Sequence, residues 1–542
     1  MIAGDMTSGG ILGQLVSFAV PLMLGSLLQQ LYNAFDAMVV GNYVSKEALA
    51  AVGASGPLIN MIIAFAVGLF GGASSLIGRF FGGRDYKGLQ TALHTTFVLS
   101  LIMAVILTFV GIGSAEWILT AMGMPDDIIP SATSYLRIYF IGLAALFVYN
   151  AGATMLTALG DSRRPLYFLM MSTVLNIVGD LFFVLVLDMG IEGVAWSTVI
   201  AEIVSAVMVV GVFMRAQGPS RLWPKKLRID PGMLKNIVGI GLPGGIQGTI
   251  VSFSNVLVQA YINGLGSVAV AGFSAAQKLD GFVGLPVQTM SLACATFVAQ
   301  NLGARQVARA RKGVRHSLLI GAVASFVIAM TAVFFAKQAL RIFTPEAAVL
   351  DAGAQFMRVM TPYNWILVFA IIIPGALRGA GSVKFSTAAS VISFVFVRQV
   401  YLFIVTKVNY TIAAVGLGYP ITWALAGIAI TIFYMKSDWS RFEPEKEAKP
   451  DEANAVPAIS ANAVSKEQSG QEIDAYSDKS ANAEEAKDLD THESPDSHES
   501  PDTQEDPIES DDLRSCPGQP DFDEEHEESL VGAVQESPES QG

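Results

Sequence analysis

Residues 27–44 read LLQQLYNAFDAMVVGNYV, an apolar stretch with a carboxylate, Asp36, near its middle. A run of this composition favours a membrane-spanning helix, because apolar side chains suit lipid and a helix satisfies its own backbone hydrogen bonds there. A charged side chain in such a helix costs about 2.5–3.5 kcal/mol on insertion scales. The stretch therefore predicts a membrane span in which a polar group is retained for a reason other than solubility.

The same apolar pattern recurs along most of the 542-residue chain, which is 52% hydrophobic and 15% charged, with a mean hydropathy of +0.49. This composition is typical of a multi-pass membrane protein. Hydropathy, interrupted by charged residues, Gly and Pro, predicts about twelve spanning helices. The predicted spans are 14–43, 53–79, 90–113, 131–156, 164–187, 191–214, 236–263, 269–299, 315–336, 353–377, 385–406 and 411–435.

The net charge of −13 averages two unlike parts of the chain. Residues 443–542 contain 30 acidic and 6 basic residues, whereas residues 1–442 contain 17 acidic and 28 basic residues. The acidic part is poor in apolar residues and repeats short units such as THESPD and SHESPD, so it buries too little surface to fold alone. We therefore predict a mildly basic helical body followed by a disordered acidic tail.

Lysine and arginine are distributed unequally between alternate connections. One set of connections holds 18 of them and the other set holds 4. The positive-inside rule predicts that the first set is cytoplasmic, and an even number of spans places both termini on that side. The longest of these connections, 215–235, suits anionic lipid headgroups rather than nucleic acid.

This connection also separates two halves that resemble each other. We therefore divide the chain into an N-terminal six-helix lobe (1–214), a linker (215–235), a C-terminal six-helix lobe (236–436) and the tail (437–542). Both halves enter the membrane from the same side, which predicts a parallel repeat about an axis along the membrane normal. The paired segments are FAVPLMLGSLL (18–28) with IGLPGGIQGTI (240–250), ALAAVGAS (48–55) with VAVAGFSA (268–275), SSLIGRFFGGRD (74–85) with CATFVAQNLGAR (294–305), and TALGDSRRP (157–165) with LRGAGSVKF (377–385).

Three polar residues of the N-terminal lobe are predicted to lie at one depth in the membrane. Asp36 and Asp180 each lie about seven residues before the outer end of a span, and Thr198 lies about seven residues after the outer start of another. At about 1.5 Å per residue, all three lie roughly 10 Å below the outer surface. Asn176 precedes Asp180 by four residues, so both lie on one helix face. Two carboxylates with amide and hydroxyl oxygens at one level predict a site for a proton or a small hard cation.

Other polar residues extend this hypothesis, and a structural alternative accompanies it. In this alternative, each acid is held by hydrogen bonds to polar neighbours and serves only to join helices. Glu202, one turn deeper than Thr198, and Asn33, on the polar stripe of the first span, are further candidates for the coupling network. Arg398 is a charge within a C-terminal span that we expect to face a central cleft. Pro21 predicts a bend in the first span, either as a fixed kink or as a hinge.

Motifs for other chemistry are absent from the sequence. It contains no GxxxxGK[ST] phosphate loop, no HExxH pair and no GxSxG elbow. His492, His498 and His526 of the tail are too sparse for a closed metal site. We therefore expect no enzymatic activity, no cofactor and no metal centre. The first ten residues carry no Lys or Arg, so no cleavable signal peptide is predicted.

Several segments together resemble the multidrug and toxic compound extrusion (MATE) family of secondary transporters, over about residues 7–436. They are MTSGGILGQLVSFAVPLMLGSLLQQLYNAFDAMVVG, EALAAVGASGPL, GRFFGGRD with AQNLGAR, LTALGDSRRPL, NIVGDLFF, GVAWSTVIAE and LRGAGSVKF. The resemblance implies an all-α membrane protein with two pseudo-symmetric lobes around a cleft, in a bacterial inner membrane. It also implies export of small organic cations or amphipathic compounds by alternating access, in exchange for H⁺ or Na⁺. We expect a monomer whose other partners are membrane lipids.

Within this family the sequence is similar to the DinF-like branch, in which the ion-coupling residues lie in the N-terminal lobe. The NorM-like branch instead has acids in spans seven and ten, where this chain has Asn255 and Asn364, so coupling in the C-terminal lobe is not expected. The residues that the resemblance assigns to ion coupling are Asp36, Asn176, Asp180 and Thr198, with Tyr139 in their network and Pro21 as the proline at which the first helix bends.

Two other functions fit parts of the sequence. A flippase of the same superfamily would move lipid-linked oligosaccharides and would need a cationic cleft, for which Lys278, Arg358 and Arg398 are candidates. A membrane anchor that presents the acidic tail to a cytoplasmic partner would need no transport at all.

Overall fold

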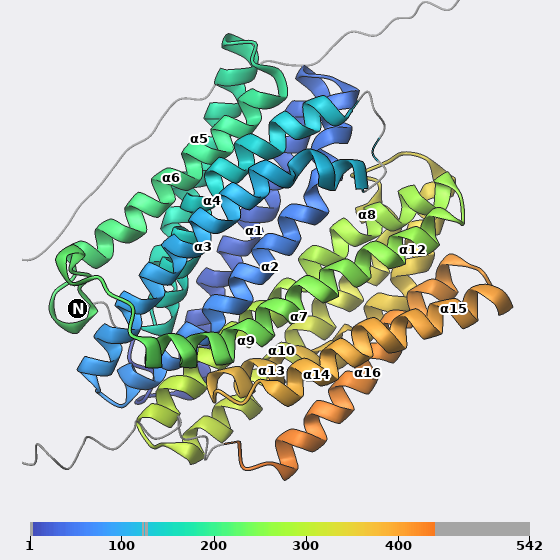
Figure 1. Cartoon of the computed structure of the whole chain (residues 1–542). Helices are drawn as coiled ribbons and strands as arrows, with labels where there is room; N and C mark the ends of the chain where they lie inside the picture. Colours follow the sequence, from blue (N-terminus) through green and yellow to red (C-terminus); the bar gives the residue numbers. More distant parts are fainter. Residues whose placement is uncertain (1–3, 122–123, 125–127, 440–542) are drawn as a thin grey trace, which may run out of the picture. The chain divides into compact units, whose positions relative to one another are not determined.

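The computed structural model describes residues 4–121, 124 and 128–439. Every regular element in this part of the chain is helical, and 12 helical segments are long and apolar enough to cross a membrane (Figure 1). The predicted all-α membrane fold is therefore confirmed. The prediction of a disordered acidic tail lies outside the described residues, apart from its first three positions.

The N-terminal half forms six membrane helices and ends in a linker with two short 3₁₀ turns. A π-helical turn ends the fifth span just after Asp180, and such turns are frequent at functional sites. The elements are α1 (Ile11–Tyr43), α2 (Lys46–Gly82), α3 (Tyr86–Ala121), α4 (Ile129–Ala158), α5 (Arg163–Leu181), η1 (Phe182–Val186), α6 (Gly190–Arg215), η2 (Gly218–Ser220) and η3 (Pro224–Lys226).

The C-terminal half also has six spans, but three of them are interrupted. Gly284 separates α8 from α9, whose second residue is Pro286, and a turn that contains Pro362 separates α12 from α13. Proline lacks the amide hydrogen that a continuing helix needs. The elements are α7 (Pro231–Asn263), α8 (Ser267–Val283), α9 (Leu285–Gly303), α10 (Val307–Phe334), α11 (Ala336–Leu340), α12 (Ala347–Met360), η4 (Thr361–Tyr363), α13 (Asn364–Gly379), α14 (Lys384–Val391), η5 (Ile392–Val397), α15 (Arg398–Val408) and α16 (Ile412–Lys436).

Several helices extend further than the hydropathy pattern predicts. The third span was predicted to end at residue 113 and ends at Ala121, and the ninth was predicted to begin at 315 and begins at Val307. Hydropathy reports only the apolar core of a helix, whereas its ends are determined by local hydrogen bonds. For example, the Asp230 carboxylate accepts from the Met233 amide, at 2.7 Å, and so caps the start of α7.

The internal repeat is visible in the backbone. Arg84 and Arg305 both adopt a left-handed conformation, with φ of 57° and 59°, and Gly160 and Gly381 do so with φ of 86° and 76°. Non-glycine residues rarely adopt this conformation, so the matched pair of arginines is a specific sign of repetition. It also corrects the sequence comparison, which paired Arg305 with Asp85 rather than with Arg84, one residue earlier.

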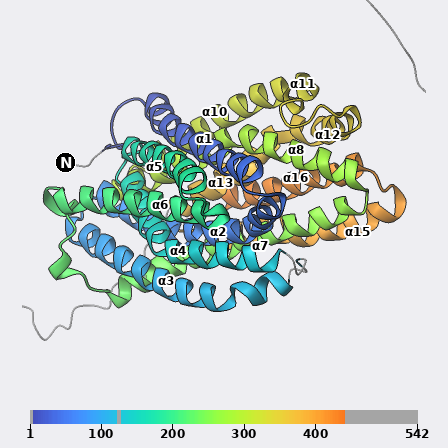
Figure 2. The ribbon, with the colours of Figure 1, turned by 90° about the horizontal axis from the view of Figure 1, so that it is seen from above.

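The two halves contact each other most closely where α2 packs along α7 (Figures 1 and 2). A Cβ atom on Gly241 would lie 2.0 Å from the Leu69 carbonyl oxygen, and one on Gly72 would lie 2.4 Å from the Gly241 amide nitrogen. One turn along, a Cβ on Gly68 would lie 2.3 Å from the Gly245 amide nitrogen. Only glycine permits this approach, because the two backbones are in direct contact.

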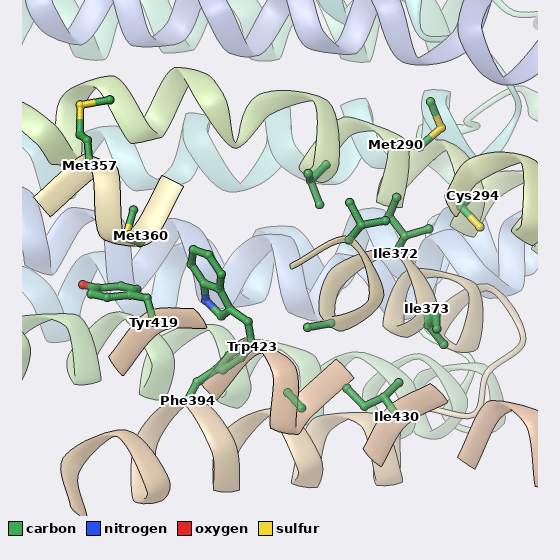
Figure 3. Close-up of a cluster of buried hydrophobic side chains, with 14 of the residues drawn as sticks. Met290, Cys294, Met357, Met360, Ile372, Ile373, Phe394, Tyr419, Trp423 and Ile430 are labelled. Carbon is green, nitrogen blue, oxygen red and sulfur yellow. The ribbon is translucent and has the colours of Figure 1, made fainter. Parts of the chain in front are cut away.

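Each half also contributes to the apolar core of the other. Leu15 and Phe18, near the start of α1, are buried in the core of the C-terminal half, part of which is shown in Figure 3. Ile237 and Ile240, near the start of α7, are buried in a core of the N-terminal half. The first turns of α1 and α7 therefore cross between the halves, which the predicted lobe boundaries did not anticipate.

Residues 4–10, the N-terminal strap, join the halves at the end that carries the basic connections. The Gly4 amide donates to the Leu159 carbonyl of the N-terminal half, at 3.1 Å, and the Met6 amide donates to the Gln300 side chain of α9, at 2.9 Å. Arg309 of α10 donates to the carbonyl oxygen of Gly9, at 2.9 Å. The strap therefore holds α9 and α10 to the connection between α4 and α5.

Candidate cation site and adjoining cavity

The four residues assigned to ion coupling meet inside the N-terminal half. Asp36 comes from α1, Asn176 and Asp180 from α5, and Thr198 from α6, and these three helices pack against one another. Asn176 and Asp180 are 0% exposed, Thr198 is 3% exposed and Asp36 is 8% exposed. The residues predicted to share one depth therefore lie in one buried cluster.

Asn176 is the central hydrogen-bond donor of the cluster. Its Nδ2 lies 3.5 Å from Asp180 Oδ1 and 3.5 Å from Thr198 Oγ1. The Asp36 carboxyl adjoins the side chains of Asp180 and Asn176. Because Asn176 precedes Asp180 by one helical turn, α5 presents both side chains to α1 and α6 at the same level.

The structure adds Ser197, which the sequence argument did not include. Its hydroxyl donates to the Asp180 carboxylate and accepts from Asn176 Nδ2, at 3.0 Å. Ser197 directly precedes Thr198, and adjacent helical residues point about 100° apart, so the two are expected to face different neighbours. Both nevertheless reach the cluster, because Asn176 of α5 donates to each of their hydroxyl groups.

Three oxygen atoms of the cluster are buried without a hydrogen-bond partner within the described part of the chain. They are Asp36 Oδ1, Asn176 Oδ1 and Asp180 Oδ2. Two neighbouring carboxylates repel each other when both are ionised in a medium of low dielectric constant. A proton, or a cation that accepts several oxygen ligands, would provide the unpartnered oxygens with a partner and would also remove the repulsion between the carboxylates.

A cavity of about 260 Å³ adjoins this cluster. Tyr32 connects the two, since it lines the cavity and its hydroxyl donates to Thr198 Oγ1, at 3.3 Å. Pro21 and Glu202 also line the cavity. Pro21 lies within a continuous α1, and its role as a kink or a hinge stays a prediction.

The remaining candidates of the N-terminal half are placed differently. Tyr139 of α4 is 6% exposed and stacks on Tyr135, with 6.4 Å between ring centroids, so it borders the cluster without a hydrogen bond to it among the described residues. The proposed polar stripe on α1 divides, because Asn33 is exposed whereas Asp36 is buried. Asn33 is therefore not a member of the cluster.

The fold and the site together define a class of protein. It is a multi-pass helical membrane protein made of two repeated six-span halves, with a carboxylate pair buried within the spans of the first half. The chain belongs to the MatE family, whose model matches it twice, over residues 21–182 and 243–404. The DinF-like branch stays a prediction.

Individual relatives agree with this assignment over most of their length. The chain is 30% identical to the "Probable multidrug resistance protein YoeA" of Bacillus subtilis, over 77% of this chain and 92% of that protein. It is 27% identical to the "Probable multidrug resistance protein YpnP" of the same species, over 81% of this chain and 98% of that protein. Its fold is similar to a solved structure described as the "outward-facing conformation of a multidrug resistance MATE family transporter", with a TM-score of 0.75, 23% identity and coverage of 79% and 96% of the two chains.

The second matched segment has no copy of the carboxylate pair. The two matches begin 222 residues apart, at Pro21 and at Pro243. At this spacing Asp36 corresponds to Val258, whereas the spacing of 221 between Gly160 and Gly381 pairs Asn176 with Val397 and Asp180 with Tyr401.

Arg398 does not face a cleft, which corrects the expectation. It is 3% exposed, because the first turn of α15 lies between α7 and α16. Its guanidinium donates to Asn255 Oδ1, at 3.2 Å, and to Thr422 Oγ1, at 3.1 Å, and lies 4.4 Å from the centroid of the Tyr419 ring. The C-terminal half thus holds a buried cation between polar and aromatic partners of its own.

Proposed function

We propose that this protein is a secondary active antiporter that exports cationic or amphipathic small molecules in exchange for H⁺ or Na⁺. The observation that carries the proposal is the oxygen cluster of Asp36, Asn176 and Asp180, whose unpartnered atoms are buried beside a cavity. Carboxylates within spanning helices cost free energy on insertion, so their retention favours a functional role. The names of the two curated relatives support multidrug compounds as substrates.

The proposed coupling runs through α1. This helix contributes Asp36 to the cluster, and Pro21, Gln29 and Tyr32 to the cavity wall. An ion at Asp36 removes the repulsion from Asp180 and so changes how α1 sits against α5. A ligand shifts a conformational equilibrium only by its differential affinity for the two states. The cavity wall and the ion cluster share α1, so each occupant biases the other.

In this proposal the two halves alternate between two arrangements, and the end with the basic connections faces the cytoplasm of a bacterium. The N-terminal strap joins the two halves near the basic connections, and the glycines of α2 and α7 join them further along these helices. Opening toward the cytoplasm requires both to separate.

The experiment is ion-driven efflux of cationic dyes from proteoliposomes, with a proton gradient and a sodium gradient imposed separately. Asp36→Asn and Asp180→Asn are expected to abolish efflux, because neither can exchange an ion. Asp188→Asn is the matched control, since Asp188 is exposed and its positive φ of 51° suits asparagine. Normal efflux by both test variants would refute the proposal.

The two alternatives gain no specific support. The three cations considered for a flippase do not line the described cavity: Lys278 and Arg358 are exposed, and Arg398 is buried among its own partners. If the protein mainly anchors the tail, deletion of residues 443–542 removes its main function. Under the antiport proposal, efflux persists without them.

A further inference from the structure

The cavity beside the cation cluster contains one acidic and one basic side chain. Of its lining residues, only Glu202 and Arg378 are of the Asp, Glu, Lys, Arg or His type. Glu202 comes from α6 of the N-terminal half, whereas Arg378 comes from α13 of the C-terminal half. The proposed antiport mechanism explains neither the presence of the arginine nor its origin in the other half.

The position of Arg378 depends on a glycine in the facing helix. A Cβ atom on Gly71 of α2 would lie 3.1 Å from Arg378 Cδ, so the arginine stem crosses α2 where no side chain is present. The next turn of α2 holds α13 in place, because the Ser75 hydroxyl donates to the Gly379 carbonyl, at 3.1 Å. The guanidinium is thereby brought to a cavity that is otherwise built mostly by the N-terminal half.

The two charged side chains are not paired with each other. Within the part of the chain that the structure describes, no hydrogen bond or ion pair joins the side chain of Glu202 or that of Arg378 to another residue. Glu202 instead lies against a second glycine, since a Cβ on Gly142 would be 3.4 Å from its Oε2. The cavity therefore presents two separate poles of opposite sign. Arg378 lies in the last turn of α13 without an ion-pair partner among the described residues, and a carboxylate in the cavity can supply one.

The rest of the cavity surface is largely apolar. Ile63 and Val67 of α2, Leu166 and Leu169 of α5, and Leu292 of α9 line it. The volume of about 260 Å³ lies near the lower end of ligand pockets, about 300 Å³, which favours a compact molecule. The wall and the poles together specify a molecule with an apolar body and a charge of each sign.

We propose that the cavity selects zwitterionic amphiphiles, with the cationic group at Glu202 and a carboxylate at Arg378. This inference rests on the proposed function and narrows its substrate class. Arg378 belongs to the other half, so the two charges of a zwitterion are bound by both halves at once only while α13 packs on α2. A zwitterion therefore stabilises this arrangement more than a simple cation does.

The test uses two fluorescent probes that differ in one group, a carboxyl-bearing rhodamine and its methyl ester. Binding of each probe to the purified full-length protein is measured by fluorescence polarisation. The wild type is expected to bind the acid about tenfold more tightly than the ester. Arg378→Gln should abolish this preference, and Arg378→Lys should retain part of it. Glu202→Gln should weaken both probes, which share the cationic group.

Arg215→Gln is the control for charge alone, because Arg215 is exposed and does not line the cavity. It should keep the wild-type preference. The inference is overturned if the wild type binds neither probe or prefers the ester, or if Arg378→Gln weakens both probes equally. Its failure is distinct from that of antiport: a preference that depends on Arg378, without ion-driven efflux, would refute only the antiport proposal.

Discussion

Replacement of Gly241 by alanine tests whether backbone contact between α2 and α7 holds the two halves together. The new Cβ would lie 2.0 Å from the Leu69 carbonyl oxygen, and ordinary contacts begin at 3.4 Å, so the helices must separate locally by about 1.4 Å. Overpacking of this kind costs about 1–3 kcal/mol. Alanine regains up to about 1 kcal/mol because it favours helix over glycine. The net expectation is a loss of up to about 2 kcal/mol.

Gly239→Ala is the matched control in the same helix, because a Cβ there would meet nothing within 4 Å. It should be neutral or stabilise the protein by about 0.5–1 kcal/mol. The assay is the midpoint of thermal denaturation in detergent, followed by tryptophan fluorescence. We expect Gly241→Ala to melt about 1–3 °C below the wild type and further below the control. If Gly241→Ala melts at or above Gly239→Ala, the close contact inferred for these helices is wrong.

Two further predictions concern buried hydrogen bonds. Ser197→Ala removes the hydroxyl that donates to Asp180 and should lower the free energy of unfolding, measured by chemical denaturation, by about 1–3 kcal/mol. Ser205→Ala loses only a 3.5 Å hydrogen bond and should lower it by less. Equal losses in the two variants would argue against the hydrogen bond from Ser197 to Asp180. Gln300→Ala frees the Met6 amide and should raise the rate of maleimide labelling of Met6→Cys in a background without other cysteines. An unchanged labelling rate would show that the strap does not depend on this side chain.

The sequence was informative about the candidate site because the argument used only local geometry. Helix rise placed Asp36, Asp180 and Thr198 at one depth, and helix periodicity placed Asn176 beside Asp180; in the structure all four lie together. Ser197 was missed because its contribution depends on how α6 is rotated against α5. That rotation is fixed by packing between distant segments, which hydropathy does not record.

The predictions that went wrong have the same cause. Arg398 was expected at a cleft and is enclosed by α7 and α16, and Asn33 was grouped with Asp36 although it is exposed. Both errors concern the direction in which a helix face points. The direction of a face is decided by neighbouring helices, so no property of the residue or of its own helix reveals it.

The sequence by itself determined the number of spans and the repeat, because each follows from composition or order along one chain, and helical rise predicted that the acids share one level. Only the tertiary structure decided that α1 and α7 exchange partners between the halves, and that Arg378 enters a cavity of the other half. Close packing at glycines accompanies both features: the backbones of α2 and α7 meet at Gly72 and Gly241, and the Arg378 side chain crosses α2 at Gly71. A glycine in one helix is informative only when the residue that faces it is known.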